Sequence, residues 1–360
     1  MTAAPDRPLR VGVIGTGFGA QVHVPAFRES PDFEVVAIVS GRRDNAERVA
    51  AQAQVAWFSD DYRAMLRDVD LDVVSVAVPG ALHHEIVLAA AAAGRHILCE
   101  KPFATSVFEG QEMLAAVRAA GVGHAINHEF RMIPARQAFR RLVVEEGVLG
   151  TMYDVRGIVD LSMLLNPTRG WSWWSDRTQY GGLMQAMTSH LIDFLLWTFG
   201  DIATLSASVD TFIRTRQTHD GTQRQVTSDD QNAALLHFTS GATGLIHVSG
   251  ISRISRSIVE AHGSAASLSI DGSALRRATE PGKLEAIDLQ PLSTSGGDER
   301  VQLMVAYLAH VARVFRGQPD PQVATFEQGL RVQAVMDAMH RSADNGGALV
   351  TLQQVATSAR

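Results

Sequence analysis

A short apolar segment near the start of the chain runs directly into a glycine-rich turn, and this junction restricts the fold more than any other feature. Residues 9–15 read LRVGVIG and the turn continues as TGFGA, so Gly15, Gly17 and Ala20 match the pattern G-x-G-x-x-G/A. The first glycine permits a tight turn, the second lets the backbone approach a pyrophosphate, and the small third residue allows a helix to pack closely on the strand. The N–H groups at the start of that helix can bind phosphate oxygens. The junction predicts a dinucleotide-binding unit.

Strand-like and helix-like segments then alternate as far as residue 127. Expected strands span 33–40, 71–79, 96–100 and 123–127, and expected helices span 45–53, 83–94 and 106–121. This alternation predicts a doubly wound parallel sheet, in which ligands bind beyond the carboxyl ends of the strands. We therefore expect cofactor contacts from the turn and from the strand ends, namely Gly15, Thr16, Gly17, Phe18, Gly19, Ala20, Ser40, Pro79, Glu100 and Asn127.

The end of the second strand bears on the type of cofactor. An NAD site usually carries Asp or Glu there to hold the ribose hydroxyls, but this chain has Ser40 followed by Gly41, Arg42 and Arg43. A hydroxyl and two guanidinium groups suit a 2′-phosphate, because arginine pairs with phosphate oxygens through two parallel hydrogen bonds. The sequence favours NADP over NAD. The alternative is that both arginines lie in a solvated loop.

The segment CEKPFA, residues 99–104, follows the next-to-last strand of this half. Pro102 would end the strand, so that Lys101 points into the mouth of the sheet. A partly desolvated lysine beside a cationic nicotinamide is suited to proton transfer, and Glu100 would anchor it or compete for it. The alternative is a surface lysine in a turn.

Four segments together resemble the Gfo/Idh/MocA family, which includes glucose–fructose oxidoreductase and inositol dehydrogenases. They are GTGFGA, VAVPGALHHE, AAAGRHILCEKPFA and the later GG…SHLID, and the likeness runs from residue 9 to the end of the chain. The resemblance implies a dinucleotide-binding domain followed by an α/β domain with a large open sheet. It also implies NAD(P)-dependent oxidoreduction of a sugar or cyclic polyol, with Lys101 contacting both the nicotinamide and the reacting hydroxyl. His23 and His83 fall in matching stretches near the cofactor, where packing or indirect support is expected.

The second half reads differently. Segments 152–164, 203–215, 232–241, 242–250, 256–264 and 266–272 have strand lengths and partial alternation, which predicts a mainly antiparallel sheet. Residues 289–300 read as a surface loop, and helices are expected near 301–316 and 324–343. We predict domains over 1–128 and 129–360, with the last helix able to pack back on the first. Helices of the chain can cover one face of this open sheet, and a second subunit would cover the other. We therefore expect a homodimer or homotetramer.

The segment GGLMQAMTSHLIDFLLW, residues 181–197, reads as an amphipathic helix that carries His190 and Asp193 on one face. In many relatives an Asp stands four residues before the histidine and works with it. Here that position is Ala186, and in an α-helix the neighbouring Gln185 would project elsewhere. His190 is a candidate catalytic residue beside Lys101. Asp193 would orient His190 and contact substrate, or serve as a structural carboxylate.

Two further features are candidates for substrate contact. Arg131, in NHEFRMIPAR, would hold a substrate hydroxyl or carboxylate, or would clamp the two domains together. The loop RGWSWWSD, residues 169–176, carries three tryptophans, and an indole face such as that of Trp173 can stack on a sugar. The alternative is that these rings pin the loop to the sheet, since buried aromatic rings are more often core.

Composition excludes several classes of protein. A net charge of −6 and the absence of a dense Lys/Arg run argue against nucleic-acid binding. The N-terminus lacks the apolar core of a signal peptide, and the apolar runs are too short for a membrane span. The single cysteine, Cys99, excludes an internal disulfide and disfavours zinc, and no metal site is expected at His83–His84. A cytoplasmic protein is the default.

Three functions remain open. The first is an NAD(P)-dependent oxidoreductase acting on a CH–OH group of a sugar-like substrate. The second keeps NAD tightly bound and uses transient oxidation to permit elimination on a glycoside. The third is a nucleotide-binding regulator without catalysis, consistent with the loss of the acid at Ala186 but disfavoured by Lys101 and His190.

Overall fold

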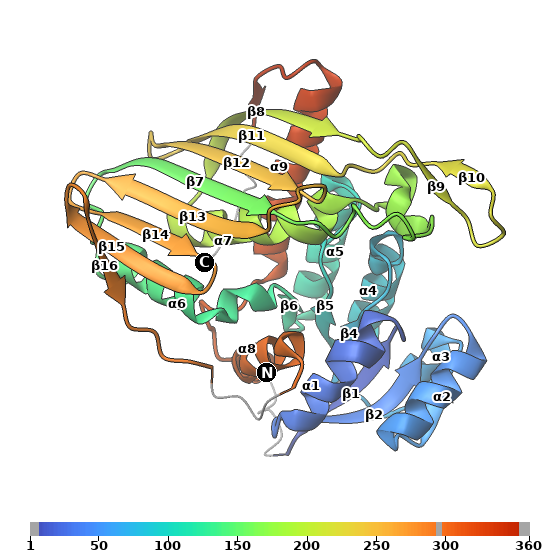
Figure 1. Cartoon of the computed structure of the whole chain (residues 1–360). Coiled ribbons are helices and arrows are strands. Elements are labelled where there is room, and N and C mark those ends of the chain that lie inside the picture. The colour runs from blue at the N-terminus through green and yellow to red at the C-terminus, as the bar shows by residue number, and fades with distance from the viewer. Residues whose placement is uncertain (1–6, 293–296, 353–360) are drawn as a thin grey trace. The chain divides into compact units, whose positions relative to one another are not determined.

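The computed structural model describes residues 7–292 and 297–352, and Figure 1 shows its elements. The chain folds into two compact units. The first comprises residues 1–132 and 292–330, and the second comprises residues 133–291 and 331–360. Residues 292–330 thus belong with the glycine-rich turn, whereas the sequence analysis placed everything after residue 128 in one domain. The centre of the loop expected at 289–300 lies outside the described residues.

The first unit is built on a six-stranded parallel sheet with the strand order β3-β2-β1-β4-β5-β6. Its strands are β1 (Leu9–Ile14), β2 (Phe33–Val39), β3 (Trp57–Ser59), β4 (Val73–Val76), β5 (His96–Cys99) and β6 (His124–Ile126). This is the doubly wound sheet predicted from the sequence. Only β3 and the helix that follows it were not predicted, because a three-residue strand is too short to show a period.

Helices and short turns connect these strands or follow the last of them. They are η1 (Gly19–His23), α1 (Val24–Glu29), α2 (Arg43–Ala53), α3 (Tyr62–Asp68), η2 (Gly80–Leu82), α4 (His83–Ala92), α5 (Val107–Ala120), η3 (Glu129–Met132), α8 (Glu299–Phe315) and the first residues of α9 (Phe326–Asp344). α5 shows why they form where they do. Its N-cap residue Ser106 accepts the N–H of Glu109, and Gly121 ends it in the left-handed conformation.

Helices on both sides of a parallel sheet bury its central strands completely, and the sequence of β4 reflects this. All four residues of β4, VVSV, are buried. Ser75 is the one polar residue among them, and a hydroxyl in such a position requires a hydrogen-bond partner. Its partner is described with the candidate site below.

The second unit contains a nine-stranded sheet with the order β16-β15-β14-β13-β7-β12-β11-β8-β17. One neighbouring pair, β12 and β7, is parallel and the others are antiparallel, as the sequence predicts. The strands are β7 (Met152–Asp160), β8 (Ile202–Asp210), β11 (Gln231–Phe238), β12 (Thr243–Ser249), β13 (Arg256–Gly263), β14 (Ser267–Asp271), β15 (Ala274–Glu280), β16 (Lys283–Ile287) and β17 (Val350–Thr351). Strands β15, β16 and β17 were not predicted.

One face of this sheet carries the core of the second unit. Its helices and turns are α6 (Pro134–Arg140), η4 (Arg141–Glu145), η5 (Trp173–Ser175), η6 (Arg177–Gln179), η7 (Met184–Thr188), α7 (Ser189–Phe199) and the remainder of α9. Apolar residues of α6, α7 and α9 pack with alternate residues of the strands, and Figure 1 shows these helices on a single side of the sheet. In the described part of this unit no helix covers the opposite face, where Leu235 is 59% exposed.

A two-stranded hairpin, β9 (Thr215–Gln217) and β10 (Gln223–Gln225), projects from the large sheet (Figure 1). Its strands are too short and too polar to be recognised from the sequence. Trp171 fixes the hairpin to the tryptophan-containing loop, because its indole N–H donates to Gln225 O and its backbone N–H donates to Gln217 O.

None of the helices within residues 7–292 and 297–352 combines the length and the hydropathy of a membrane span.

Candidate functional site

The glycine-rich turn has the geometry that the motif predicts. Gly15 has a φ of +114°, and a Cβ atom added to it would lie 2.1 Å from Ala77 O. A Cβ on Gly17 would meet nothing within 4 Å, so this backbone faces open space. The close packing expected from Ala20 comes instead from Gly19, whose missing Cβ would lie 3.2 Å from Ala77 Cβ. The turn can therefore receive a pyrophosphate at Gly17.

Two alanine substitutions should separate folding from cofactor binding at this turn. Gly15→Ala is expected to lower the free energy of unfolding by about 2 kcal/mol or more, because the new methyl group collides with backbone and φ is unfavourable. Gly17→Ala should leave the thermal unfolding midpoint unchanged and weaken dinucleotide binding about tenfold, because the methyl group occupies the space the pyrophosphate needs. Calorimetry and cofactor titration measure the two effects. Equal cofactor affinity in Gly17→Ala and wild type would contradict this assignment.

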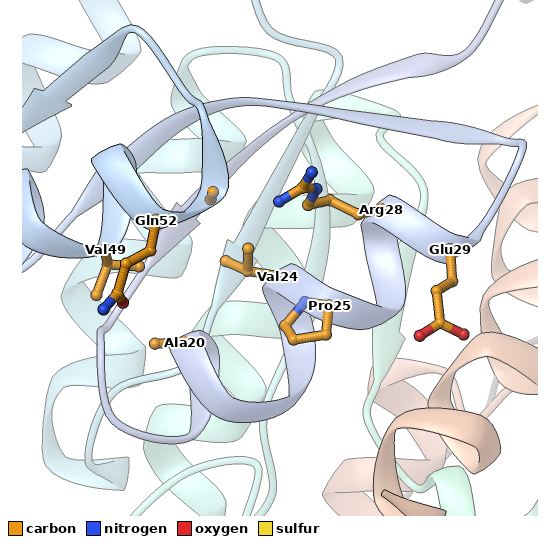
Figure 2. A pocket seen from close by; sticks show the side chains of 8 residues that line it. Ala20, Val24, Pro25, Arg28, Glu29, Val49 and Gln52 are labelled. Atoms are coloured by element: carbon orange, nitrogen blue, oxygen red, sulfur yellow. The ribbon is translucent and has the colours of Figure 1, made fainter. Parts of the chain in front are cut away.

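Ala20 lines an open hollow of about 460 Å³ between α1 and α2. Figure 2 shows Val24 and Pro25 of α1 on one side and Val49 and Gln52 of α2 on the other. None of the strand-end residues contributes to its lining, and Arg28 and Glu29 are its only charged side chains. The hollow therefore carries no chemistry that connects it with the glycine-rich turn.

The end of β2 offers hydroxyl groups and arginines, as expected. Ser40 Oγ lies 2.7 Å from Thr16 Oγ1, which joins the β2 end to the glycine-rich turn. Arg42 is exposed and forms an ion pair with Asp44 at 2.5 Å. Arg43 lies over the ring of Phe58, with its guanidinium carbon 5.3 Å from the ring centroid. A guanidinium nitrogen of Arg43 lies 3.9 Å from a carboxylate oxygen of Asp60. Both guanidinium groups are at the surface and accessible to a phosphate.

A buried hydrogen-bond network lies at the ends of β4, β5 and β6. Glu100 Oε1 is 2.8 Å from His23 Nε2 and accepts a hydrogen bond of 2.6 Å from Asn127 Nδ2, while His23 Nδ1 is 2.7 Å from Ser75 Oγ. The backbone N–H of Lys101 donates to Glu100 Oε2 at 3.2 Å. The network joins two of the predicted strand-end residues, Glu100 and Asn127, to His23 and Ser75.

This network keeps Glu100 ionised. Burial by itself would raise the pKa of the Glu100 carboxyl, but the hydrogen bond and charge of His23, the charge of Lys101 and the Asn127 hydrogen bond together lower it. Asn127 is completely buried and its Oδ1 has no hydrogen-bond partner among the described residues. An amide N–H of a nicotinamide would satisfy that oxygen, so the residues present fit the cofactor.

The ring of His83 hydrogen-bonds to two segments beside this network. Its Nε2 lies 2.9 Å from Val78 O and its Nδ1 lies 3.0 Å from Pro102 O, so the ring links the segment after β4 to the turn after β5. Burial lowers the pKa of His83 and favours the neutral ring. Pro79 is the N-cap residue of η2, and the Lys101–Pro102 peptide bond is cis. The supporting role expected of His83 agrees with these contacts.

The segment of residues 181–199 in the second unit begins at two glycines that the structure requires. A Cβ on Gly181 would lie 2.5 Å from Trp174 O, and a Cβ on Gly182, whose φ is +123°, would lie 2.2 Å from Asp229 Oδ1. The segment expected to be one α-helix is a π-helical turn, η7, followed by the α-helix α7. His190 and Asp193 both lie on α7 and are buried. They are three residues apart, so they share a face.

A buried carboxyl group from the loop that precedes β11 holds the start of this helix. Asp229 Oδ2 accepts the backbone N–H of Met184 and the side-chain N–H of Asn232, both at 2.9 Å, and Asn232 Oδ1 accepts the hydroxyl of Thr188 at 3.0 Å. Burial raises the pKa of Asp229 to about 7, against the opposing effect of these hydrogen bonds. Asp229 was not predicted from the sequence. Its signal was the acidic pair Asp229–Asp230 directly before a buried strand.

The remaining substrate candidates lie in different settings. Arg131 is buried, and its guanidinium donates to Gln322 O at 3.4 Å, which ties η3 to the segment before α9. Trp173 is 41% exposed, whereas Trp174 is half-buried beneath the guanidinium of Arg169. Exposure thus leaves Trp173 available to a ligand, while Trp171 and Trp174 fasten the loop. Lys101 and His190 belong to different units.

Two family models match the chain. The model described as "Oxidoreductase family, NAD-binding Rossmann fold" matches residues 9–128, and the "GFO/IDH/MocA C-terminal domain" matches residues 138–269. Among solved structures, levoglucosan dehydrogenase in complex with NADH and levoglucosan has a TM-score of 0.86 at 24% identity, covering 97% of this chain and 100% of that one. An NAD binding oxidoreductase from Klebsiella pneumoniae has a TM-score of 0.85 at 27% identity, covering 96% and 100%.

Curated relatives are similar in sequence. Levoglucosan dehydrogenase of Pseudarthrobacter phenanthrenivorans is 30% identical over 260 residues, or 66% of this chain and 66% of that protein. D-glucoside 3-dehydrogenase of Escherichia coli is 28% identical over 96% of this chain and 98% of that protein. An oxidoreductase of Synechocystis is 33% identical over 60% of this chain, and the match spans only 57% of its own length. The chain therefore belongs to the Gfo/Idh/MocA family of NAD-binding oxidoreductases.

Proposed function

We propose that the protein transfers hydride between a nicotinamide cofactor and a secondary alcohol or ketone of a sugar, polyol or similar cyclic substrate. The observation that carries this proposal is the placement of Lys101 directly after the buried Glu100–His23–Asn127 network at the strand ends. The names of two relatives, levoglucosan dehydrogenase and D-glucoside 3-dehydrogenase, support a sugar-like substrate.

Each candidate residue has a proposed role. The nicotinamide, when bound, supplies the hydride acceptor or donor. Lys101 accepts the hydroxyl proton during oxidation and returns it during reduction, and His190 is the second proposed catalytic residue, with a hydrogen bond to substrate. The glycine-rich turn and Asn127 hold the cofactor. Trp173, Arg131 and Asp193 complete the proposed substrate contacts, with the exposure of Trp173 supporting its part.

We favour NADP as the cofactor. Arg42 and Arg43 are exposed after β2, and neither an Asp nor a Glu occupies the strand end at Ser40. Two guanidinium groups offer a 2′-phosphate charge-assisted hydrogen bonds, although Arg42 would first have to leave Asp44.

A steady-state screen tests both the reaction and the cofactor. Hexoses, inositols and anhydro sugars are offered with NAD and with NADP, and we expect turnover with a higher kcat/KM for NADP. Arg43→Ala should lower kcat/KM for NADP about tenfold and leave that for NAD nearly unchanged, since one charge-assisted contact is lost. Arg67→Ala, an exposed arginine on α3, is the control. Absence of turnover with every substrate would refute the function, and a preference for NAD would refute the cofactor choice.

We also propose that the protein is a homodimer or homotetramer. The face of the nine-stranded sheet that carries no helix in the described part of the second unit supports this, because Leu235 and Leu245 of neighbouring strands lie on it. A second copy would cover such a face. The molar mass in solution, measured by light scattering, tests the proposal.

A further inference from the structure

The helix that carries His190 does not begin with α-helical spacing. At η7 the backbone N–H of Ser189 donates to Met184 O, five residues earlier instead of four. With α-helical spacing Ala186 would lie one turn before His190. The π-helical turn contains one extra residue, so Gln185 moves toward the His190 face. Such turns inside helices occur often at functional sites.

Gln185 is polar and yet almost completely enclosed. The residue is 4% exposed, and its Oε1 is fully buried and accepts no hydrogen bond from the described residues. A buried amide oxygen without a partner destabilises a fold, so its presence requires an explanation. A ligand that completes its hydrogen bonds is one such explanation.

Asp229 and the oxygen of this amide border the same glycine. The Cβ atom that Gly182 lacks would lie 2.2 Å from Asp229 Oδ1 and 3.3 Å from Gln185 Oε1. Asp229 Oδ2 accepts the backbone N–H of Met184, the residue before Gln185. Asp229 thus fixes the backbone next to Gln185, and the buried amide oxygen is left for a ligand that donates a hydrogen bond.

We propose that Gln185, positioned by Asp229 through the backbone of Met184, is a substrate-binding residue that replaces the acid missing at Ala186 and hydrogen-bonds a substrate hydroxyl on the His190 face. This inference rests on the proposed function and narrows its substrate class to neutral polyhydroxy compounds. An uncharged amide both donates and accepts, as a sugar hydroxyl does. Because the side-chain amide of Gln185 is neither an acid nor a base near neutral pH, proton transfer remains assigned to Lys101.

Gln185→Met tests the inference, because methionine has a similar length and cannot form the hydrogen bond. With a substrate from the screen we expect kcat/KM to fall about tenfold or more, mainly through KM. Cofactor affinity should not change. The unfolding midpoint should stay the same or rise, because the substitution removes the unpaired buried oxygen of Gln185. Gln223→Met, at an exposed position of β10, is the matched control and should change nothing.

Each outcome decides the matter. A wild-type protein without turnover on any substrate would overturn the proposed function and this inference together. Turnover in wild type that Gln185→Met leaves unchanged would overturn the inference alone. A loss of activity accompanied by a lower unfolding midpoint and weaker cofactor binding would show that Gln185 is structural and would also overturn it. If the methionine variant does not fold, Gln185→Asn, one methylene shorter, should raise KM in a folded protein.

Discussion

Replacement of Lys101 by Met is expected to lower kcat by about 10²- to 10⁴-fold while cofactor affinity stays close to that of the wild type. That range is the usual contribution of a positioned proton carrier. Methionine removes the amine but retains the length of the side chain, and the backbone N–H that donates to Glu100 is unaffected. Steady-state kinetics with NADP and NAD, together with a cofactor titration, measure the two quantities.

The sequence provides an unusually clean control for this experiment. The chain contains only two lysines, and the other one, Lys283, lies on the exposed strand β16 in an ion pair with Glu280. Lys283→Met should have the kinetics of the wild type. Equal losses in both variants, or none in Lys101→Met, would contradict a role for Lys101 in proton transfer.

The same scarcity of lysine permits a direct observation of Lys101. Reductive methylation with labelled formaldehyde would give two dimethyl-lysine signals besides that of the N-terminus. Addition of cofactor should shift the Lys101 signal and leave the Lys283 signal in place. This spectroscopic result does not depend on knowing the substrate, so it separates cofactor placement from catalysis.

The first unit was predictable because its signals are local. A glycine with φ of +114° and a strand that is buried on both faces leave clear marks in the sequence, as Gly15 and β4 show. The strand ends follow from the alternation of elements, and the rule for parallel sheets then gathers Ser40, Glu100 and Asn127 at one edge. What could not be predicted is which side chains join them. His23 reaches Glu100 across 77 residues, and no short-range pattern encodes that pairing.

The candidate helix of the second unit shows the opposite case. The double glycine and His190 mark this helix in the sequence. They do not show which earlier residues share the face of His190, because hydrophobic spacing does not reveal a single π-helical turn. The carboxylate that accepts the N–H of Met184 likewise comes from a loop 45 residues away in the sequence. Assignment of residues 292–330 to the first unit is also a non-local result, since it depends on contacts such as the hydrogen bond from Tyr307 to Ile126. Contacts between residues far apart in the sequence, such as these, leave no local pattern from which they could be predicted.

For Asp229→Asn we expect the free energy of unfolding, measured relative to that of the wild type, to be higher at alkaline pH than at acidic pH. The native state holds a proton on Asp229 up to a pKa of about 7, whereas an Asp in an unfolded chain loses it near 3.8. Between these values the native state binds more protons, so this group's contribution to the free energy of unfolding falls as pH rises. The fall is about 1.4 kcal/mol per pH unit and is complete above about pH 7.

Asparagine keeps the hydrogen bonds and removes the titration. Its side-chain oxygen can still accept from Met184 and Asn232, which replaces the function of Oδ2. The difference in unfolding free energy between Asp229→Asn and wild type should therefore rise by about 3 kcal/mol from about pH 5 to about pH 8. Urea denaturation at both pH values measures it, and taking the difference cancels all groups common to the two proteins. Asp271→Asn, at the exposed end of β14, is the control and should give the same difference at both pH values. A pH-independent difference for Asp229→Asn would show that the native state releases this proton as readily as the unfolded chain does, and the carboxyl would then act at Gly182 as an anion.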